Sequence, residues 1–291
     1  MMDACVGPSR EVTLPHGKDV PALGLGTWRM GESASRIVQE VAALRLALEI
    51  GYRVIDTAEM YGAGGAEAVV GEAVRGAMRN GIAREDLFVV SKALPEHADT
   101  AGLVAACEAS LRRLQLDHLD LYLLHWRAGV PLKDTIDGFE ILQQRGLIRH
   151  WGVSNFDRDD MRDLFDAPGG TACSANQVWY SLTQRGVEFD LLPWQRVQQM
   201  PLMAYCPIDQ GALADHPGLR DVAARHGATP AQVALAWLLH QPGVMAIPKA
   251  VSALHLRHNW QAAHLSLTPN DLTELDVEFP WPARKTPLAM R

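Results

Sequence analysis

Short apolar runs alternate with helix-like stretches along almost the whole of this 291-residue chain. Eight such runs can be distinguished, and each is followed by residues whose apolar positions recur at helical spacing. The runs succeed one another at roughly thirty residues, the length of a strand–helix–strand unit. Eight consecutive units predict an α/β fold of the (β/α)8 barrel type, in which a ring of parallel strands lies inside a ring of helices.

The predicted strands cover residues 22–26, 52–56, 87–91, 119–124, 148–153, 174–178, 202–205 and 243–247. Before them, the turn signal at 15–18 predicts a small hairpin that starts at Arg10, and residues 280–291 are expected to form a short irregular tail. No proline-, glycine- or serine-rich linker interrupts the pattern. We therefore expect one domain over residues 1–291.

Charge and composition narrow the classes of function. The formal net charge of -7 argues against nucleic acids and anionic membranes as partners. No apolar run reaches the length of a membrane span, and the first ten residues lack the pattern of a secretory signal. The 4 cysteines form no C-x-x-C pair, and no cluster of His, Asp or Glu has the spacing of metal ligands. These features predict a reduced, soluble, cytoplasmic protein without a metal, which we expect to be monomeric.

Four chemically active side chains fall at the ends of consecutive predicted strands. Asp56 ends the second strand, and Tyr61 follows five residues later. Lys92 and His125 end the third and fourth strands. In a (β/α)8 barrel the active site lies at the carboxyl ends of the strands, and neighbouring strands are about 4.8 Å apart. The four side chains are therefore expected to converge on one rim.

This combination suits protonation of a carbonyl oxygen. A phenol is a poor acid at neutral pH, but a nearby ammonium group can lower its pKa. We expect Lys92 to act on Tyr61 in this way while Asp56 holds the ammonium charged, and His125 to orient a carbonyl. Taken singly, Asp56 could cap a turn, Lys92 could lie on the surface and His125 could belong to the core. Their common position at successive strand ends favours the functional interpretation.

At this point the chain resembles the aldo-keto reductases, from Gly24–Trp28 through to Ile247–Lys249. The catalytic tetrad of that family matches Asp56, Tyr61, Lys92 and His125. The resemblance implies an enzyme that reduces aldehydes or ketones with NADPH and without a Rossmann domain. The strings at 56–67 and 188–194 resemble a bacterial subgroup that reduces methylglyoxal and other small aldehydes, so the expected partner is a small carbonyl substrate.

The resemblance also assigns the cofactor site. The expected cofactor-binding residues are Gly26, Thr27, Trp28, Asp56, Ser154, Asn155, Gln177, Tyr205, Cys206, Ile208, Gln210, Lys249, Ser252, His255 and Asn259. Among these, Ser154, Asn155 and Gln177 would hold the nicotinamide carboxamide, and Tyr205 would stack on the ring.

Several departures from the family's pattern affect that site. Cys206 and Ile208 replace other residues in the loop along the pyrophosphate, and Asp209 puts an unexpected acid there. His255 stands where an arginine commonly clamps the 2′-phosphate, and histidine is mostly neutral at pH 7. Arg257 or His258 could compensate. We expect NADPH, held less tightly, and leave NADH open as a second cofactor.

The candidates for the substrate pocket walls are Trp28, Met60 and Trp126, although Trp126 could equally be barrel-end packing. In the family that the chain resembles, the loop at 126–132 and the tail after residue 280 line the substrate pocket. Both are short here, so the resemblance implies an open, permissive pocket. Two other functions are kept as alternatives. A nicotinamide-binding sensor or regulatory subunit would keep the tetrad and turn over little. A barrel hydrolase or isomerase using Asp56 and His125 would leave Lys249 unexplained.

Overall fold

The computed structural model describes residues 11–127 and 129–290, and its central sheet is a ring of parallel strands. The strands are β3 (Gly24–Gly26), β4 (Val54–Asp56), β5 (Phe88–Ala93), β6 (Leu119–Leu124), β7 (Ile148–Ser154), β8 (Asn176–Trp179), β9 (Leu202–Tyr205) and β10 (Val244–Ala246). Each pairs with the next along the chain. Parallel bridges from Leu23 to Ala246 and from Gly26 to Lys249 join the first strand to the last. The predicted (β/α)8 barrel is confirmed.

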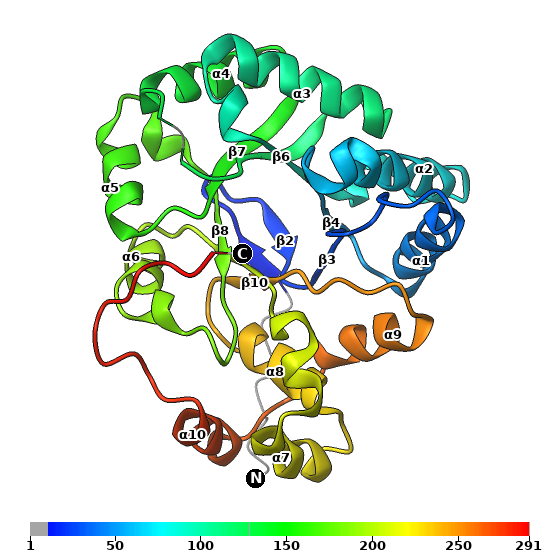
Figure 1. Cartoon of the computed structure of the whole chain (residues 1–291), viewed down its shortest axis with the longest axis vertical. Helices are drawn as coiled ribbons and strands as arrows, with labels where there is room; N and C mark the ends of the chain where they lie inside the picture. Colours follow the sequence, from blue (N-terminus) through cyan, green and yellow to red (C-terminus); the bar gives the residue numbers. More distant parts are fainter. Residues whose placement is uncertain (1–10, 128, 291) are drawn as a thin grey trace.

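Helices surround the ring of strands on the outside, as Figure 1 shows. They are α1 (Ile37–Ile50), α2 (Gly65–Arg79), α3 (Thr100–Leu114), α4 (Leu132–Gln144), α5 (Arg158–Asp166), α6 (Leu191–Val197), α7 (Arg220–Arg225), α8 (Pro230–Leu239), α9 (Ala253–Ala262) and α10 (Pro269–Glu278). None of the helices described is long and apolar enough to cross a membrane. Strands that are covered by helices on one side and by the barrel interior on the other are shielded from water on both faces, and every residue of β5 and β6 is indeed buried.

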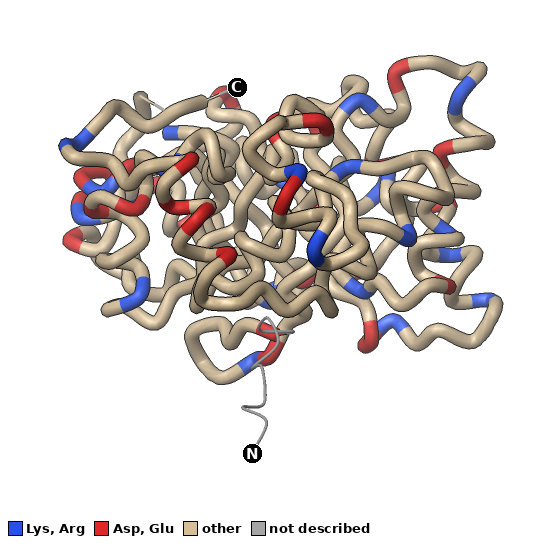
Figure 2. Tube along the Cα trace, turned by 90° about the horizontal axis from the view of Figure 1, so that it is seen from below, with Lys and Arg blue, Asp and Glu red and all other residues tan. Residues whose placement is uncertain are grey.

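The hairpin at the start of the described chain closes one end of the barrel. β1 (Glu11–Thr13) and β2 (Asp19–Pro21) pair antiparallel, and Val12 and Val20 are buried. Figure 2 shows the hairpin on the side of the molecule opposite the C-terminus. Arg10, which we included in the predicted hairpin, lies outside the described residues. The strand predicted at 22–26 is shorter than expected, because Pro21 ends β2 and β3 begins only at Gly24.

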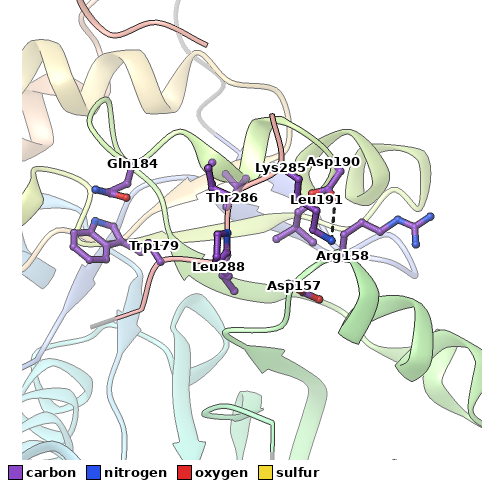
Figure 3. A pocket seen from close by; sticks show the side chains of 13 residues that line it. Asp157, Arg158, Trp179, Gln184, Asp190, Leu191, Lys285, Thr286 and Leu288 are labelled. Carbon is purple, nitrogen blue, oxygen red and sulfur yellow. Dashed lines mark ion pairs between the residues drawn. The ribbon is translucent and has the colours of Figure 1, made fainter. Parts of the chain in front are cut away.

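The C-terminal tail is attached to the outer part of the barrel mouth. Lys285 pairs with Asp159 at 2.9 Å and with Asp190 at 3.3 Å. Thr286 and Leu288 lie beside Trp179 around a small cavity of about 40 Å³ (Figure 3). This contact positions the tail beside the segments that follow β7 and β8.

Candidate active site

The four residues predicted at the strand ends do meet on one rim. Asp56 is the last residue of β4, Lys92 lies near the end of β5 and His125 directly follows β6. Lys92 Nζ donates to both carboxylate oxygens of Asp56 at 2.8 Å. It also donates to the Thr57 carbonyl at 2.8 Å and lies 3.5 Å from the Tyr61 hydroxyl. The ammonium group is therefore the centre of the cluster.

His125 completes the cluster on the side of Tyr61. The two rings meet edge to face, with their centroids 5.8 Å apart. Asn155 Nδ2 donates to the His125 carbonyl at 3.1 Å, which ties the end of β6 to the end of β7. Asp56, Lys92 and His125 are all buried. The ends of three successive strands thus bring together a carboxylate, an ammonium group, a phenol and an imidazole.

The protonation of Tyr61 differs from the sequence-based expectation. We expected Lys92 to lower the pKa of the phenol. Instead, burial raises the pKa of Tyr61 well above its ordinary value, and the negative charge of Asp56 adds to the rise. The reason is that Asp56 contacts the ammonium through both oxygens and offsets its charge, while burial disfavours a phenolate. Tyr61 is consequently held in its protonated form.

Burial also governs the two basic groups. It lowers the pKa of Lys92, and the opposing effect of the Asp56 carboxylate limits that shift. It lowers the pKa of His125 to about 3, with the Lys92 charge acting in the same direction. His125 is therefore a neutral imidazole at physiological pH, suited to hydrogen bonding and not to ion pairing.

The cluster opens into a cavity of about 810 Å³ at the C-terminal ends of the strands. Most of the predicted cofactor and substrate residues line it, namely Gly26, Thr27, Trp28, Asp56, Met60, Ser154, Asn155, Gln177, Tyr205, Cys206, Ile208, Gln210, Lys249, His255 and Asn259. Tyr61 and His125 also face it. The volume of the cavity and its mixture of apolar and polar walls are those of a binding site for a small molecule or a cofactor.

Amide and hydroxyl groups lie next to the cluster of Asp56, Lys92, Tyr61 and His125. Gln177 Nε2 donates to Asp56 Oδ1 at 2.7 Å. Ser154 Oγ donates to the Gln177 carbonyl at 2.8 Å, and Tyr205 Oη donates to Asn155 Oδ1 at 2.9 Å. These bonds fix the orientation of both amides. The aromatic ring of Tyr205 is thereby held at the wall of the cavity.

The loop after β9 has an unusual backbone. Cys206, Asp209 and Gln210 all have φ near +50° (49°, 51° and 54°), a left-handed conformation that costs about 1–2 kcal/mol per residue outside glycine. Such strain is often found at binding sites. The Asp209 carboxylate, which we expected along the cofactor's pyrophosphate, accepts a hydrogen bond from Thr183 Oγ1 at 2.8 Å, and Asp209 does not line the cavity. Its charge thus serves to fasten the loop.

Basic and polar residues from the segment after β10 and from α9 also line the cavity. They are Lys249, His255, His258 and Asn259. Ser252 does not line the cavity; its hydroxyl caps α9 by accepting from the His255 N–H at 3.3 Å. This is its observed contact, and its expected role at the cofactor remains a prediction.

Trp126 is also absent from the cavity wall. Its ring packs beside that of His125, with centroids 5.0 Å apart. This contact agrees with the alternative of barrel-end packing. None of residues 280–290 lines the large cavity either.

The sequence did not identify every lining residue. The further ones are Arg29, Pro207, Gly211, Ala214, Asp215, Thr229, Ala231, Ile247, Pro248, Leu254 and His258. Of these, His258 had been considered only as a substitute for arginine. Arg29 lies over the Trp28 ring at 4.4 Å, and its place directly after Gly26–Trp28 was a signal that could have been used. The rest are mostly apolar residues, for which composition offers no signal. Within the described part of the chain, no cluster of three or more His, Cys, Asp or Glu could hold a metal ion.

Comparison with known proteins agrees with this geometry. The model of the Aldo/keto reductase family matches residues 22–277. The methylglyoxal reductase YeaE of Escherichia coli (strain K12) is 48% identical over 276 residues, covering 93% of this chain and 95% of that protein. The glyoxal reductase of Bacillus subtilis (strain 168) is 36% identical over 267 residues, covering 91% of each chain.

Among solved structures, an aldo-keto reductase from Klebsiella pneumoniae in complex with NADPH superimposes with a TM-score of 0.92 at 48% identity. The match covers 97% of this chain and 99% of that one. The predicted resemblance and the predicted class of enzyme, an oxidoreductase, are confirmed. The chain belongs to the aldo/keto reductase family.

Proposed function

We propose that this protein reduces small aldehydes and ketones, methylglyoxal among them, to alcohols with NADPH. The observation that supports this most directly is the buried cluster of Asp56, Lys92, Tyr61 and His125 at the wall of a large cavity. The relatives named for methylglyoxal and glyoxal reduction, and the similar structure in complex with NADPH, point the same way.

The cavity residues suit a nicotinamide dinucleotide. Lys249, His255 and His258, which line the cavity, offer cationic or hydrogen-bonding groups for phosphate. Asn155, Gln177 and the Tyr205 ring lie beside the catalytic cluster, where an amide and an aromatic ring would be recognised. When bound, the cofactor would supply the hydride that reduces the carbonyl carbon. NADH stays open as a second cofactor, because position 255, where an arginine commonly clamps the 2′-phosphate of NADPH, is a histidine.

The residues of the cluster would then divide the proton chemistry. Tyr61, which burial keeps protonated, donates its proton to the carbonyl oxygen as a general acid. The phenolate that results would lie 3.5 Å from Lys92 Nζ, the nearest cationic group of the cluster, whose charge Asp56 partly offsets. Asp56 holds Lys92 in position through two hydrogen bonds. Neutral His125 orients the carbonyl by hydrogen bonding.

The substrate would lie between the cluster and the apolar walls formed by Trp28 and Met60. Because neither the described residues of the 126–132 loop (126, 127 and 129–132) nor residues 280–290 line the cavity, we expect a permissive site that accepts several small carbonyl compounds. Trp126 remains a candidate for the pocket only as a prediction. We also propose that the protein works as a cytoplasmic monomer.

The test is oxidation of NADPH, and separately of NADH, followed at 340 nm with a panel of small aldehydes and ketones that includes methylglyoxal. Rapid oxidation of NADPH that depends on the carbonyl compound would support the proposal and rank the substrates. Tight binding of NADPH without turnover on any carbonyl compound would contradict it and favour the sensor alternative.

A further inference from the structure

Glu59 lies in the short segment that joins Asp56 to Tyr61, and its side chain is only 8% exposed. Its Oε1 accepts a hydrogen bond from the Leu94 N–H at 2.7 Å and lies 2.8 Å from His97 Nδ1. Its Oε2 is 3.9 Å from Arg113 Nη2. A buried carboxylate with three partners is fixed in orientation. The cluster described above makes no use of it.

The contacts of Glu59 with β5 fall at Lys92 and just after it. The Glu59 N–H donates to the Lys92 carbonyl at 3.3 Å, and the Glu59 carboxylate accepts from the N–H of Leu94, two residues further on. Glu59 is therefore attached to the backbone at the end of β5, beginning at the residue that carries the ammonium group. Tyr61 follows Glu59 by only two residues, so the attachment of Glu59 to β5 restricts where the backbone of Tyr61 can lie.

Arg113, which lies near Glu59 Oε2, is itself held by a second carboxylate. Its Nε donates to the carboxylate of Glu67, which is fully buried and also accepts from Ser91 Oγ at 2.6 Å. The stem of Arg113 passes against Gly64, where an added Cβ would lie 2.5 Å from Arg113 Cδ. The segment from Glu59 to Glu67 is thus attached to α3 and to β5 on the side away from the cavity.

We propose that Glu59 is a positioning residue for the reduction: it holds the Tyr61 hydroxyl at its working distance from Lys92 by fastening the intervening segment to the end of β5. The inference rests on the proposed function. Misplacement of a reacting group by about 1 Å can reduce the rate by about 100-fold, so a contact of this kind matters even though it touches neither substrate nor cofactor.

A simpler role must be distinguished from this one. Glu59 also holds the short turn at 95–97, and its loss could merely destabilise that turn. A purely structural role would lower the stability or the active fraction of the protein. It would leave the chemical step of the folded enzyme unchanged, because Tyr61 and Lys92 would keep their separation.

The experiment compares the full-length enzyme with Glu59→Ala, Glu59→Gln and the control Glu96→Ala, which removes an exposed carboxylate nearby. NADPH binding is measured by tryptophan fluorescence, and kcat with methylglyoxal is measured with NADPH and with NADPH deuterated at the transferred position. We expect Glu59→Ala to bind NADPH normally, to lose at least about 10-fold in kcat and to show a larger deuterium isotope effect. Glu59→Gln keeps an oxygen for the Leu94 N–H and should recover most of the rate, and Glu96→Ala should match wild type.

Three results would overturn the inference. One is a Glu59→Ala enzyme with unchanged kcat. Another is a loss of kcat without any rise in the isotope effect, which would indicate a smaller active fraction. The third is an equal loss in Glu59→Gln. A wild type that reduces no carbonyl compound would instead contradict the proposed function, so the two failures are distinguishable.

If Glu59→Ala does not fold, Leu94→Pro tests the same contact from the other side. The backbone of Leu94 has φ of -68°, which proline adopts without strain. The substitution removes the N–H that Glu59 accepts. The same fall in kcat, with normal NADPH binding and a larger isotope effect, would support the inference. An unchanged kcat would overturn it.

Discussion

Burial sets the protonation of two residues at the rim of the barrel. It raises the pKa of Tyr61 and lowers the pKa of His125, so each is held in the neutral form that can donate a hydrogen bond. Lys92 and Asp56 neutralise one another between them. At the scale of single residues, the site therefore combines two neutral hydrogen-bond donors, Tyr61 and His125, with one ion pair, Asp56–Lys92, whose two charges cancel.

His125 should make the stability of the protein depend on pH. Its pKa of about 3 in the folded state lies below the value of about 6.5 for an unfolded histidine. Between these values the unfolded chain binds more protons, so the free energy of unfolding falls as the pH falls below about 6.5, by at most about 1.4 kcal/mol per pH unit. Above about pH 6.5 the histidine is neutral in both the folded and the unfolded state, so it no longer changes the free energy of unfolding as the pH rises.

We predict that His125→Asn flattens this dependence. Urea unfolding at a series of pH values from about 4.5 to 7.5 measures it for wild type, for the variant and for His264→Asn at an exposed position. The control should follow wild type. Equal slopes in His125→Asn and wild type would contradict a depressed pKa.

At the scale of elements, the site depends on loops that pack backbone against backbone. Gly31, in the loop after β3, lies so close to the start of α2 that an added Cβ would be 2.1 Å from the Gly65 carbonyl carbon. The same loop carries Trp28, and the chain before α2 carries Tyr61. The Gly31 N–H donates to Glu40 Oε2 at 2.8 Å. The close approach of Gly31 to Gly65 sets the cavity wall that carries Trp28 relative to Tyr61.

Gly31→Ala should therefore cost much more than a comparable change elsewhere. Both Gly31 and Gly17 have positive φ, 72° and 87°, but an added Cβ at Gly17 meets no atom within 4 Å. We predict a loss of about 1 kcal/mol for Gly17→Ala from backbone strain alone and about 3 kcal/mol for Gly31→Ala from strain and overpacking together. Chemical denaturation measures both. Equal losses of stability in the two variants would contradict the prediction, because they would show that the loop at Gly31 can move away from Gly65 without cost.

Periodicity predicted the elements well where their signals were local. A threonine followed by proline is a local signal for the start of a helix, and Thr229 and Pro230 stand at the start of α8, where Thr229 forms a capping box with Gln232. The division of 19–26 into β2 and β3 could not be predicted, because it depends on which partner each segment meets: β2 pairs with β1, and β3 with β4. The direction of the Asp209 side chain was hidden for the same reason, since its partner Thr183 lies in another loop.

At the scale of the whole molecule, closure of the barrel brings distant parts of the chain into one site. The Gly26 N–H donates to the Pro248 carbonyl at 3.1 Å, and the Ala246 N–H donates to the Ala22 carbonyl at 2.8 Å. Lys249 thereby lies next to the strand pair that carries Asp56. Neither half of the chain contains the complete cavity.

We predict that the chain unfolds as one unit, as expected for a single domain. Far-UV circular dichroism and tryptophan fluorescence should give coincident urea transitions, because the ring of strands loses its first and last partners together. Bound NADPH should shift both transitions to higher urea concentration by the same amount, since a ligand that binds only the folded state stabilises it. Two separate transitions would contradict this.

The sequence located the cluster because Asp56, Lys92 and His125 each end a strand, and the fold alone brings such positions together. It could not indicate the protonation of Tyr61, which depends on burial and on the close Asp56–Lys92 pair. It also could not separate Trp126 from the cavity wall, because the direction of a side chain after a strand is set by its neighbours in space.

The central claim is that Tyr61 delivers the proton, and Tyr61→Phe tests it most directly. The change removes only the hydroxyl that lies 3.5 Å from Lys92 Nζ. We predict unchanged NADPH affinity by fluorescence titration and a loss of about 100-fold or more in kcat for methylglyoxal, the range for general acid catalysis. A Tyr61→Phe enzyme that binds NADPH and retains near-wild-type turnover would contradict the account.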